Sequence, residues 1–289
     1  MRRRLFFRLA VFFLLFSVSL SLSSAEAISP YTKGKIGEFM DLRVRIRSTS
    51  SDSEAVAIIS AAEDEALGGL LGNAADMEQE TCILRSMYLV ERHEHLLAAK
   101  NRDALRKLMK SQMSRNVACL EERLKSGAEI SSWLYLYCGD ITSYYMTRSI
   151  PATLLYGLRV KAWYEGAVAL SPKMTLANVS LGNWYFYAPP PFGSRKKSER
   201  CYKAAVEGAE ADGEKYLAYQ FLSQLYFEMG NASESAACID KAASLGLGTA
   251  ELDAMRELNG KGISLFAHNR NRVGIDEDIP EDAKEADDR

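Results

Sequence analysis

The sequence lacks the short motifs that mark the common enzyme classes. It contains no G-x-S-x-G turn, no glycine-rich phosphate loop, no Cys-x-x-Cys pair and no run of two-residue apolar alternation that would form a strand. Two of its three histidines, His93 and His95, are two residues apart, which puts them on different faces of a helix, unlike the pair of a zinc helix. We therefore predict a protein that is not an enzyme and has no catalytic residue, metal site or cofactor.

The chain also has few cysteines, and its basic residues do not outnumber its acidic ones. The chain has 36 Lys and Arg against 38 Asp and Glu, a formal net charge of −2, which does not favour nucleic-acid binding. Five cysteines are too few for a disulfide-stapled scaffold, so buried free thiols are the expected state. Cys201 and Cys238 take equivalent places in stacked helices, too far apart to bridge, whereas a disulfide between Cys119 and Cys138 is an open alternative.

No apolar run reaches the roughly 20 residues that a membrane-spanning helix needs. Residues 9–22, which are almost wholly apolar, follow an arginine-rich start and precede small residues that end in Ala25-Glu26-Ala27. This order is typical of a secretory signal peptide cut after Ala27. We expect a periplasmic or secreted protein, attached to a membrane only if the segment stays uncleaved. Removing residues 1–27 takes the counts of basic and acidic residues from 36 and 38 to 32 and 37.

What the sequence does contain is a succession of helix-compatible segments. Apolar residues recur at spacings of three and four from residue 54 onward, and Gly, Asn, Ser and Pro separate the runs. The pattern predicts an all-α fold, with amphipathic helices from residue 53, over 78–99 and over 103–125, and no clear element in 28–50. We expect a signal peptide (1–27), an N-terminal helical region (28–130), repeats (131–260) and an acidic disordered tail (261–289).

An internal repeat is the strongest signal. Side chains of the expected size fill seven places of the tetratricopeptide pattern: Leu222, Ser223, Tyr226, Gly230, Ser235, Ile239 and Ala242. The small residues at the eighth and twentieth places, Ser223 and Ser235, allow the two helices of a hairpin to approach closely. The segment resembles a tetratricopeptide repeat. The resemblance implies a stack of helical hairpins, a TPR-like α-solenoid, because one hairpin cannot bury both of its faces.

Two earlier segments repeat the pattern. One has Leu181, Gly182 and Tyr185 on its first helix and Ser198, Tyr202 and Ala205 on its second. The other, a poorer match, runs from Cys138 and Gly139 to Tyr164, Ala167 and Pro172. The joint of the first segment is four residues longer than the repeat allows, and the surplus falls on residues 189–192, whose three prolines place it between helices. The basic run 195–197 after this joint either faces water behind a serine cap, Ser194 or Ser198, or binds an anion.

Tetratricopeptide stacks form a concave face from their first helices, and this face is the candidate binding site. Its ninth places hold the polar residues Asp140, Asn183 and Gln224. The fifth and twelfth places add Gln220, Phe186 and Phe227, and Tyr187 stands with Trp184 beside the proline joint as a wall for a small ligand. A polar column beside an aromatic one would bind a peptide or a small organic ligand. The alternative is an ordinary helix surface with packed aromatic rings.

The segment 185–205 also resembles a narrower group, the exported T components of TRAP-type transporters. The resemblance rests on Tyr187-Ala188-Pro189, Gly193-Ser194 and Ala204-Ala205, an aromatic-Ala-Pro run that leads through a glycine-containing joint into a second helix. It implies a periplasmic helper in ligand capture, with a periplasmic substrate-binding protein as a candidate partner and a homo-oligomer as an open alternative. The chain departs from that group because no cysteine precedes Cys82 to carry a lipid anchor.

These observations predict an exported, non-catalytic binding protein. Its TPR-like concave face would take a protein or peptide partner, for protein–protein interaction or assembly. The alternative is a small-ligand-binding accessory component of a TRAP-type uptake system, and a hydrolase without a known motif is the third hypothesis.

Overall fold

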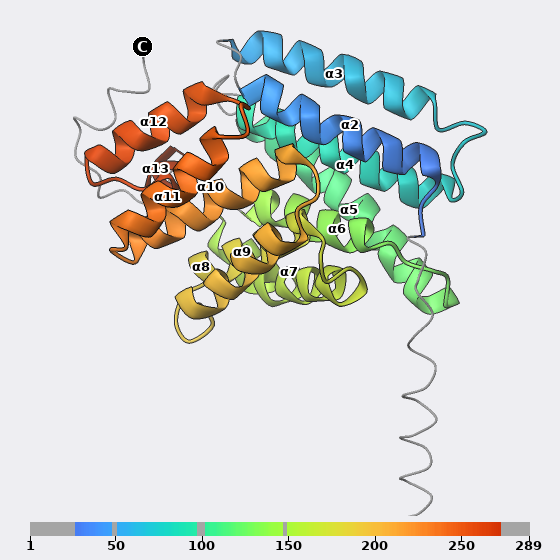
Figure 1. Cartoon of the computed structure of the whole chain (residues 1–289). Helices are drawn as coiled ribbons and strands as arrows, with labels where there is room; N and C mark the ends of the chain where they lie inside the picture. Colours follow the sequence, from blue (N-terminus) through green and yellow to red (C-terminus); the bar gives the residue numbers. More distant parts are fainter. Residues whose placement is uncertain (1–26, 48–50, 97–101, 147–148, 273–289) are drawn as a thin grey trace, which may run out of the picture.

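The computed structural model describes residues 27–47, 51–96, 102–146 and 149–272, and these residues form helices and no strand. Figure 1 shows the helices packed side by side along the chain. The helices of the described residues are α2 (Pro30–Arg47), α3 (Asp52–Gly68), α4 (Met77–Leu96), α5 (Arg102–Ser126), α6 (Ser132–Met146), α7 (Ile150–Leu170), α8 (Thr175–Tyr187), α9 (Arg195–Gly208), α10 (Asp212–Glu228), α11 (Ala232–Ala243), α12 (Thr249–Gly260) and α13 (Leu265–Arg272).

The predicted all-α stack of helical hairpins is confirmed. Helices α4 and α5, α6 and α7, α8 and α9, and α10 and α11 pair as hairpins, and each hairpin packs on the next. The first helices of successive hairpins, α4, α6, α8 and α10, also contact one another. They form the side of the stack that we call the concave face, and the helices predicted from residue 53, over 78–99 and over 103–125 correspond to α3, α4 and α5.

Small residues bring the two helices of each repeat together, as the spacing predicts. A Cβ atom at Gly182 of α8 would overlap the ring of Tyr202 in α9, and one at Gly139 of α6 would overlap the ring of its partner tyrosine in α7. In the hairpin of α10 and α11 the two hydroxyl oxygens of Ser223 and Ser235 lie 3.2 Å apart. The close approach lets Tyr202 become fully buried, so the small residue and the ring act as one packing unit.

The joint between α8 and α9 is lengthened as predicted. Residues 188–194 separate these helices, seven in all, whereas the three residues 229–231 separate α10 from α11, so the difference is four. Ser194 is the N-cap of α9, since its hydroxyl accepts the backbone N–H of Lys197 at 3.3 Å. Ser194 in turn donates its own N–H to the carbonyl of Tyr185 at 2.8 Å, which fixes the second helix against the end of the first.

The ends of the chain differ most from the sequence predictions. Residues 30–47, for which no element was clear, form the long helix α2. The disordered tail predicted to begin at residue 261 is wrong for residues 261–272, because α13 forms there and buries Phe266 to 1% exposure. The predicted signal peptide up to residue 26 and the acidic stretch 273–289 lie outside the described residues. Within the part that is described, no helix is both long enough and apolar enough to cross a membrane.

Helix α2 lies against the concave face. In Figure 1 it runs beside α3, and it contacts the first helices α4 and α10, which are separated by two hairpins in the sequence. Gly213 at the start of α10 allows this approach, because its backbone comes close to the carbonyl of Met40 in α2. Val44 of α2 then packs in one apolar cluster with Tyr216 of α10. The N-terminal helix therefore joins the two ends of the stack.

Candidate partner-binding site on the concave face

Helix α2 contacts the concave face at α4 and α10, the first helices of the first and last hairpins. Phe39 packs its ring against Tyr88 of α4, with centroids 5.2 Å apart and the rings nearly perpendicular. Arg43, four residues further along α2, pairs with Glu91 of α4 at 2.8 Å, and only 1% of the Glu91 side chain is exposed. A buried carboxylate next to one guanidinium is costly to separate from it. The position of α2 over α4 is therefore fixed by an apolar contact and an ion pair.

The C-terminal end of the concave face is occupied by α13. Phe266 inserts among four rings, two from α8, one from α9 and one from α10; we call these rings and Phe266 the aromatic cluster. The ring centroids lie 4.4 Å from Phe186, 5.8 Å from Tyr187, 6.4 Å from Tyr202 and 6.0 Å from Phe221. Offset and tilted rings at these separations stabilise one another beyond the area that they bury.

Polar contacts fix the register of this segment. The backbone N–H of Leu265 donates to Oε1 of Gln224 in α10 at 2.6 Å. The hydroxyl of Ser264 donates to the carboxylate of Glu228, one turn further along α10, and also caps α13 by accepting the N–H of Ala267 at 2.9 Å. The concave face thus binds a short polypeptide of this chain through a side-chain amide, a carboxylate and the aromatic cluster.

The predicted site residues Asp140 and Asn183 make hydrogen bonds inside the repeats. Asp140 accepts the hydroxyl of Tyr164 from α7 at 2.9 Å and that of Ser180 from α8 at 2.8 Å. Asn183 accepts the hydroxyl of Tyr202 from α9 at 2.6 Å. The ninth place of each of these repeats therefore binds the tyrosine of the second helix. Burial raises the pKa of Asp140 to about 6, despite the two hydroxyl donors that favour its ionised form.

The other predicted residues divide into two groups. Phe186, Tyr187 and Gln224 come together around α13, as described above. Gln220 is 1% exposed, and its amide has no hydrogen-bond partner among the described residues, so it lies inside the stack and does not reach a groove. Phe227 is half-buried on α10 outside the aromatic cluster. Trp184 donates its indole N–H to the carbonyl of Gly157 in α7 at 2.9 Å and so faces a different helix from Tyr187.

Sequence reasoning missed Phe221, Ser264 and Phe266. Phe221 lies between the repeat positions Gln220 and Leu222, and the repeat pattern predicts only a packing role for Tyr202. The mostly apolar stretch Ile263-Ser264-Leu265-Phe266 precedes the acidic run that begins at Asp276. That contrast is the signal that would have separated α13 from the tail.

Groups with reactive chemistry lie elsewhere. Over the described residues, no cluster of three or more His, Cys, Asp and Glu side chains could hold a metal ion. His93 stacks on Tyr144 with centroids 4.5 Å apart, and Nδ1 of His95 hydrogen-bonds to Asp52 at 2.7 Å. All five cysteines are free thiols. The interaction between the thiols of Cys82 and Cys119 lowers the pKa of Cys82 and raises that of Cys119.

Comparison with solved structures finds similarity to a helical repeat protein. No protein-family model matches the chain, and no curated protein matches it. The chain is similar to the crystal structure of a thermophilic TPR protein from Thermus thermophilus, with 15% identity and a TM-score of 0.47 over 78% of this chain and 97% of that one. The tetratricopeptide-like character rests on the hairpin contacts of this chain itself. The resemblance to the T components stays a sequence prediction.

Proposed function

We propose that this protein is an exported, non-catalytic binding protein that captures a protein partner on the concave face of its TPR-like stack. The observation that carries the proposal is α13, which the concave face already binds in the way it would bind a partner peptide. Residues 1–27, with their resemblance to a signal peptide, support export to the periplasm or beyond.

The contacts of α13 define the chemistry of the partner segment. It carries an aromatic residue for the aromatic cluster, a free backbone N–H for Gln224 and a hydroxyl for Glu228, at the spacing of Ser264, Leu265 and Phe266. Such a segment competes with α13 for the same donors and rings. Because α13 is tethered and therefore present at high effective concentration, the partner must bind the face more tightly than α13 does or loosen α13 first.

The alternative, a small-ligand component of a TRAP-type uptake system, requires Trp184 and Tyr187 to line one pocket, which they do not do in the described residues. Its proposed walls, Trp184 and Tyr187, contact different helices. We therefore retain the protein-binding function as the proposal.

Affinity capture with the full-length mature chain tests this function. The baits are the wild-type protein, the Phe266→Ala variant, the double variant Phe266→Ala/Gln224→Ala and a control, Phe192→Ala, which removes an exposed ring of the proline joint. A partner from a periplasmic extract should be enriched on Phe266→Ala, because α13 no longer fills the aromatic cluster, and lost again in the double variant. Equal recovery on all four baits, or recovery on none, would contradict the proposed function.

A further inference from the structure

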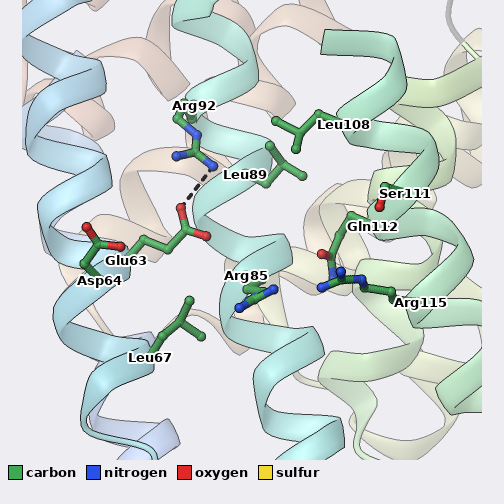
Figure 2. Close-up of a pocket in the computed structure, with 10 residues that line it drawn as sticks. All are labelled: Glu63, Asp64, Leu67, Arg85, Leu89, Arg92, Leu108, Ser111, Gln112 and Arg115. Atoms are coloured by element: carbon green, nitrogen blue, oxygen red, sulfur yellow. Dashed lines mark ion pairs between the residues drawn. The ribbon is translucent and has the colours of Figure 1, made fainter. Parts of the chain in front are cut away.

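A second candidate site lies away from the concave-face contacts of α2 and α13. Helices α3, α4 and α5 enclose a cavity of about 350 Å³ that opens to solvent. Figure 2 shows its charged lining: Arg85 and Arg92 come from α4, Arg115 from α5 and Glu63 from α3. Leucines of the three helices form the apolar part of the wall. We call this cavity the arginine pocket.

The acidic residues of the pocket neutralise only part of its positive charge. Glu63 pairs with Arg92 at 3.0 Å, as the dashed line in Figure 2 marks. Burial raises the pKa of Glu63, while the charges of Arg92 and Arg85 oppose that rise. Asp64, the other acid of the lining, is exposed. One of the three guanidinium groups, that of Arg92, is therefore in an ion pair, and those of Arg85 and Arg115 are not.

Arg85 and Arg115 have no partner in the described part of the chain. Neither makes a hydrogen bond or an ion pair with a described residue, and in Figure 2 Arg115 extends from α5 toward Arg85 of α4. The Nε atoms of Arg85 and Arg92 are buried without a hydrogen-bond acceptor. Arg85 is half-buried and Arg115 is exposed, so the two positive charges lie at the open side of the cavity, where an anion can reach them and reduce their mutual repulsion.

We propose that the arginine pocket binds a small organic anion that carries a phosphate or carboxylate group. The guanidinium groups of Arg85 and Arg115 match the forked acceptors of such a group. The cavity volume equals roughly a dozen water molecules at about 30 Å³ each, so a bare inorganic ion would leave most of it empty. The leucine walls accommodate the carbon atoms of the ligand.

Titration calorimetry on the full-length mature protein tests this site with three probes: inorganic phosphate, glycerol 3-phosphate and succinate. At least one of the two organic anions should bind with a Kd of about 1 mM or tighter at low salt. Inorganic phosphate should bind more weakly than the better organic probe, since it fills less of the pocket. The preference between glycerol 3-phosphate and succinate identifies the anionic group. If none of the three probes binds, the proposal is overturned.

Variants separate the site from a general charge effect. Arg85→Gln and Arg115→Gln should each weaken binding by about tenfold or more, because each removes a charged donor. The control Arg200→Gln makes the same change of charge on an exposed position of α9 outside the pocket and should leave binding unchanged. Glu63→Gln should tighten binding, because it releases Arg92 from its ion pair. Equal losses in Arg85→Gln and Arg200→Gln, or weaker binding by Glu63→Gln, would contradict a specific site.

Discussion

At the scale of single residues, polar side chains of the repeats stabilise the hairpins through hydrogen bonds between their two helices. Asp140 and Asn183 were candidates for a ligand-binding column, and each accepts the hydroxyl of the tyrosine that packs across its own hairpin. A polar residue at a given place of a helix can form a hydrogen bond with solvent or with a neighbouring hydroxyl, and the periodicity of the sequence does not distinguish the two. This is why the fold class was predictable and the exposure of these residues was not.

Asp140 should make stability depend on pH. The pKa of its carboxyl is raised from 3.8 to about 6 in the folded state, so the folded protein retains a proton that the unfolded chain releases. The contribution of Asp140 to the free energy of unfolding is largest below about pH 4. It falls by on the order of 1–3 kcal/mol as the pH rises toward 6. Asp140→Asn keeps the acceptor oxygen and should therefore match the wild type near pH 4 and be more stable near pH 7 in urea unfolding. A stability difference that stays constant over this range would contradict the assignment.

Gln220 should be replaceable by an apolar side chain. Its amide is buried without a hydrogen-bond partner among the described residues, which costs roughly 1–3 kcal/mol relative to a satisfied group. Gln220→Met has a similar length and no unsatisfied donor, so we expect a higher free energy of unfolding. Gln224→Met is the matched comparison and should be destabilising, because Gln224 accepts the N–H of Leu265. Loss of stability in Gln220→Met would show that its amide has a partner, such as a buried water.

At the scale of helices, repeat spacing predicted the hairpins because the small residues and large rings have defined partners. The helices at the two ends had no such pattern. Helix α2 places Arg43 at a half-buried position, where it pairs with the buried Glu91, so the apolar stripe of α2 is interrupted in the sequence. Helix α13 has only 8 residues and is too short to be stable alone, and its order comes from contacts with α8, α9 and α10. Tertiary contacts of this kind are not visible in local periodicity.

The hairpin packing predicts opposite effects for two glycines in helices. Gly182→Ala should destabilise the protein by about 1–3 kcal/mol, because the added Cβ overlaps the buried ring of Tyr202. Gly157→Ala in α7 meets no atom within 4 Å and should instead be neutral or stabilising by up to about 1 kcal/mol, as expected for alanine in a helix. Thermal or urea unfolding of the two variants measures both. Similar stabilities would contradict the alignment of the repeats.

At the scale of the whole molecule, the chain covers its own concave face. Helix α2 contacts α4 and α10 and so connects the first and last hairpins, and α13 lies at the C-terminal end of the face. The two contacts differ in strength of attachment. The contact of the long helix α2 includes the ion pair between Arg43 and the buried Glu91 of α4. The contact of the short helix α13 depends on one deeply buried ring, that of Phe266. The C-terminal part of the face is therefore the part that a partner can reach at the lower cost.

The arginine pocket is separate from this surface, because α3, α4 and α5 form it and neither α2 nor α13 contributes a residue to its lining. We expect peptide binding and anion binding to be measurable independently. Phe266→Ala should leave anion affinity unchanged, and Arg85→Gln should leave partner capture unchanged. A loss of both functions in either variant would indicate unfolding, which circular dichroism detects.

The concave face binds polypeptide and holds α13 in the folded chain. A fluorescent peptide of residues 262–272, titrated by anisotropy into the full-length Phe266→Ala protein, tests it most directly. We expect saturable binding to this variant and much weaker binding to the wild type, because its own α13 competes with the peptide. Binding should be lost when Gln224→Ala is added. The same peptide with alanine in place of its phenylalanine should not bind. No binding to Phe266→Ala, or equal binding to this variant and the wild type, would show that the concave face is not a polypeptide-binding site.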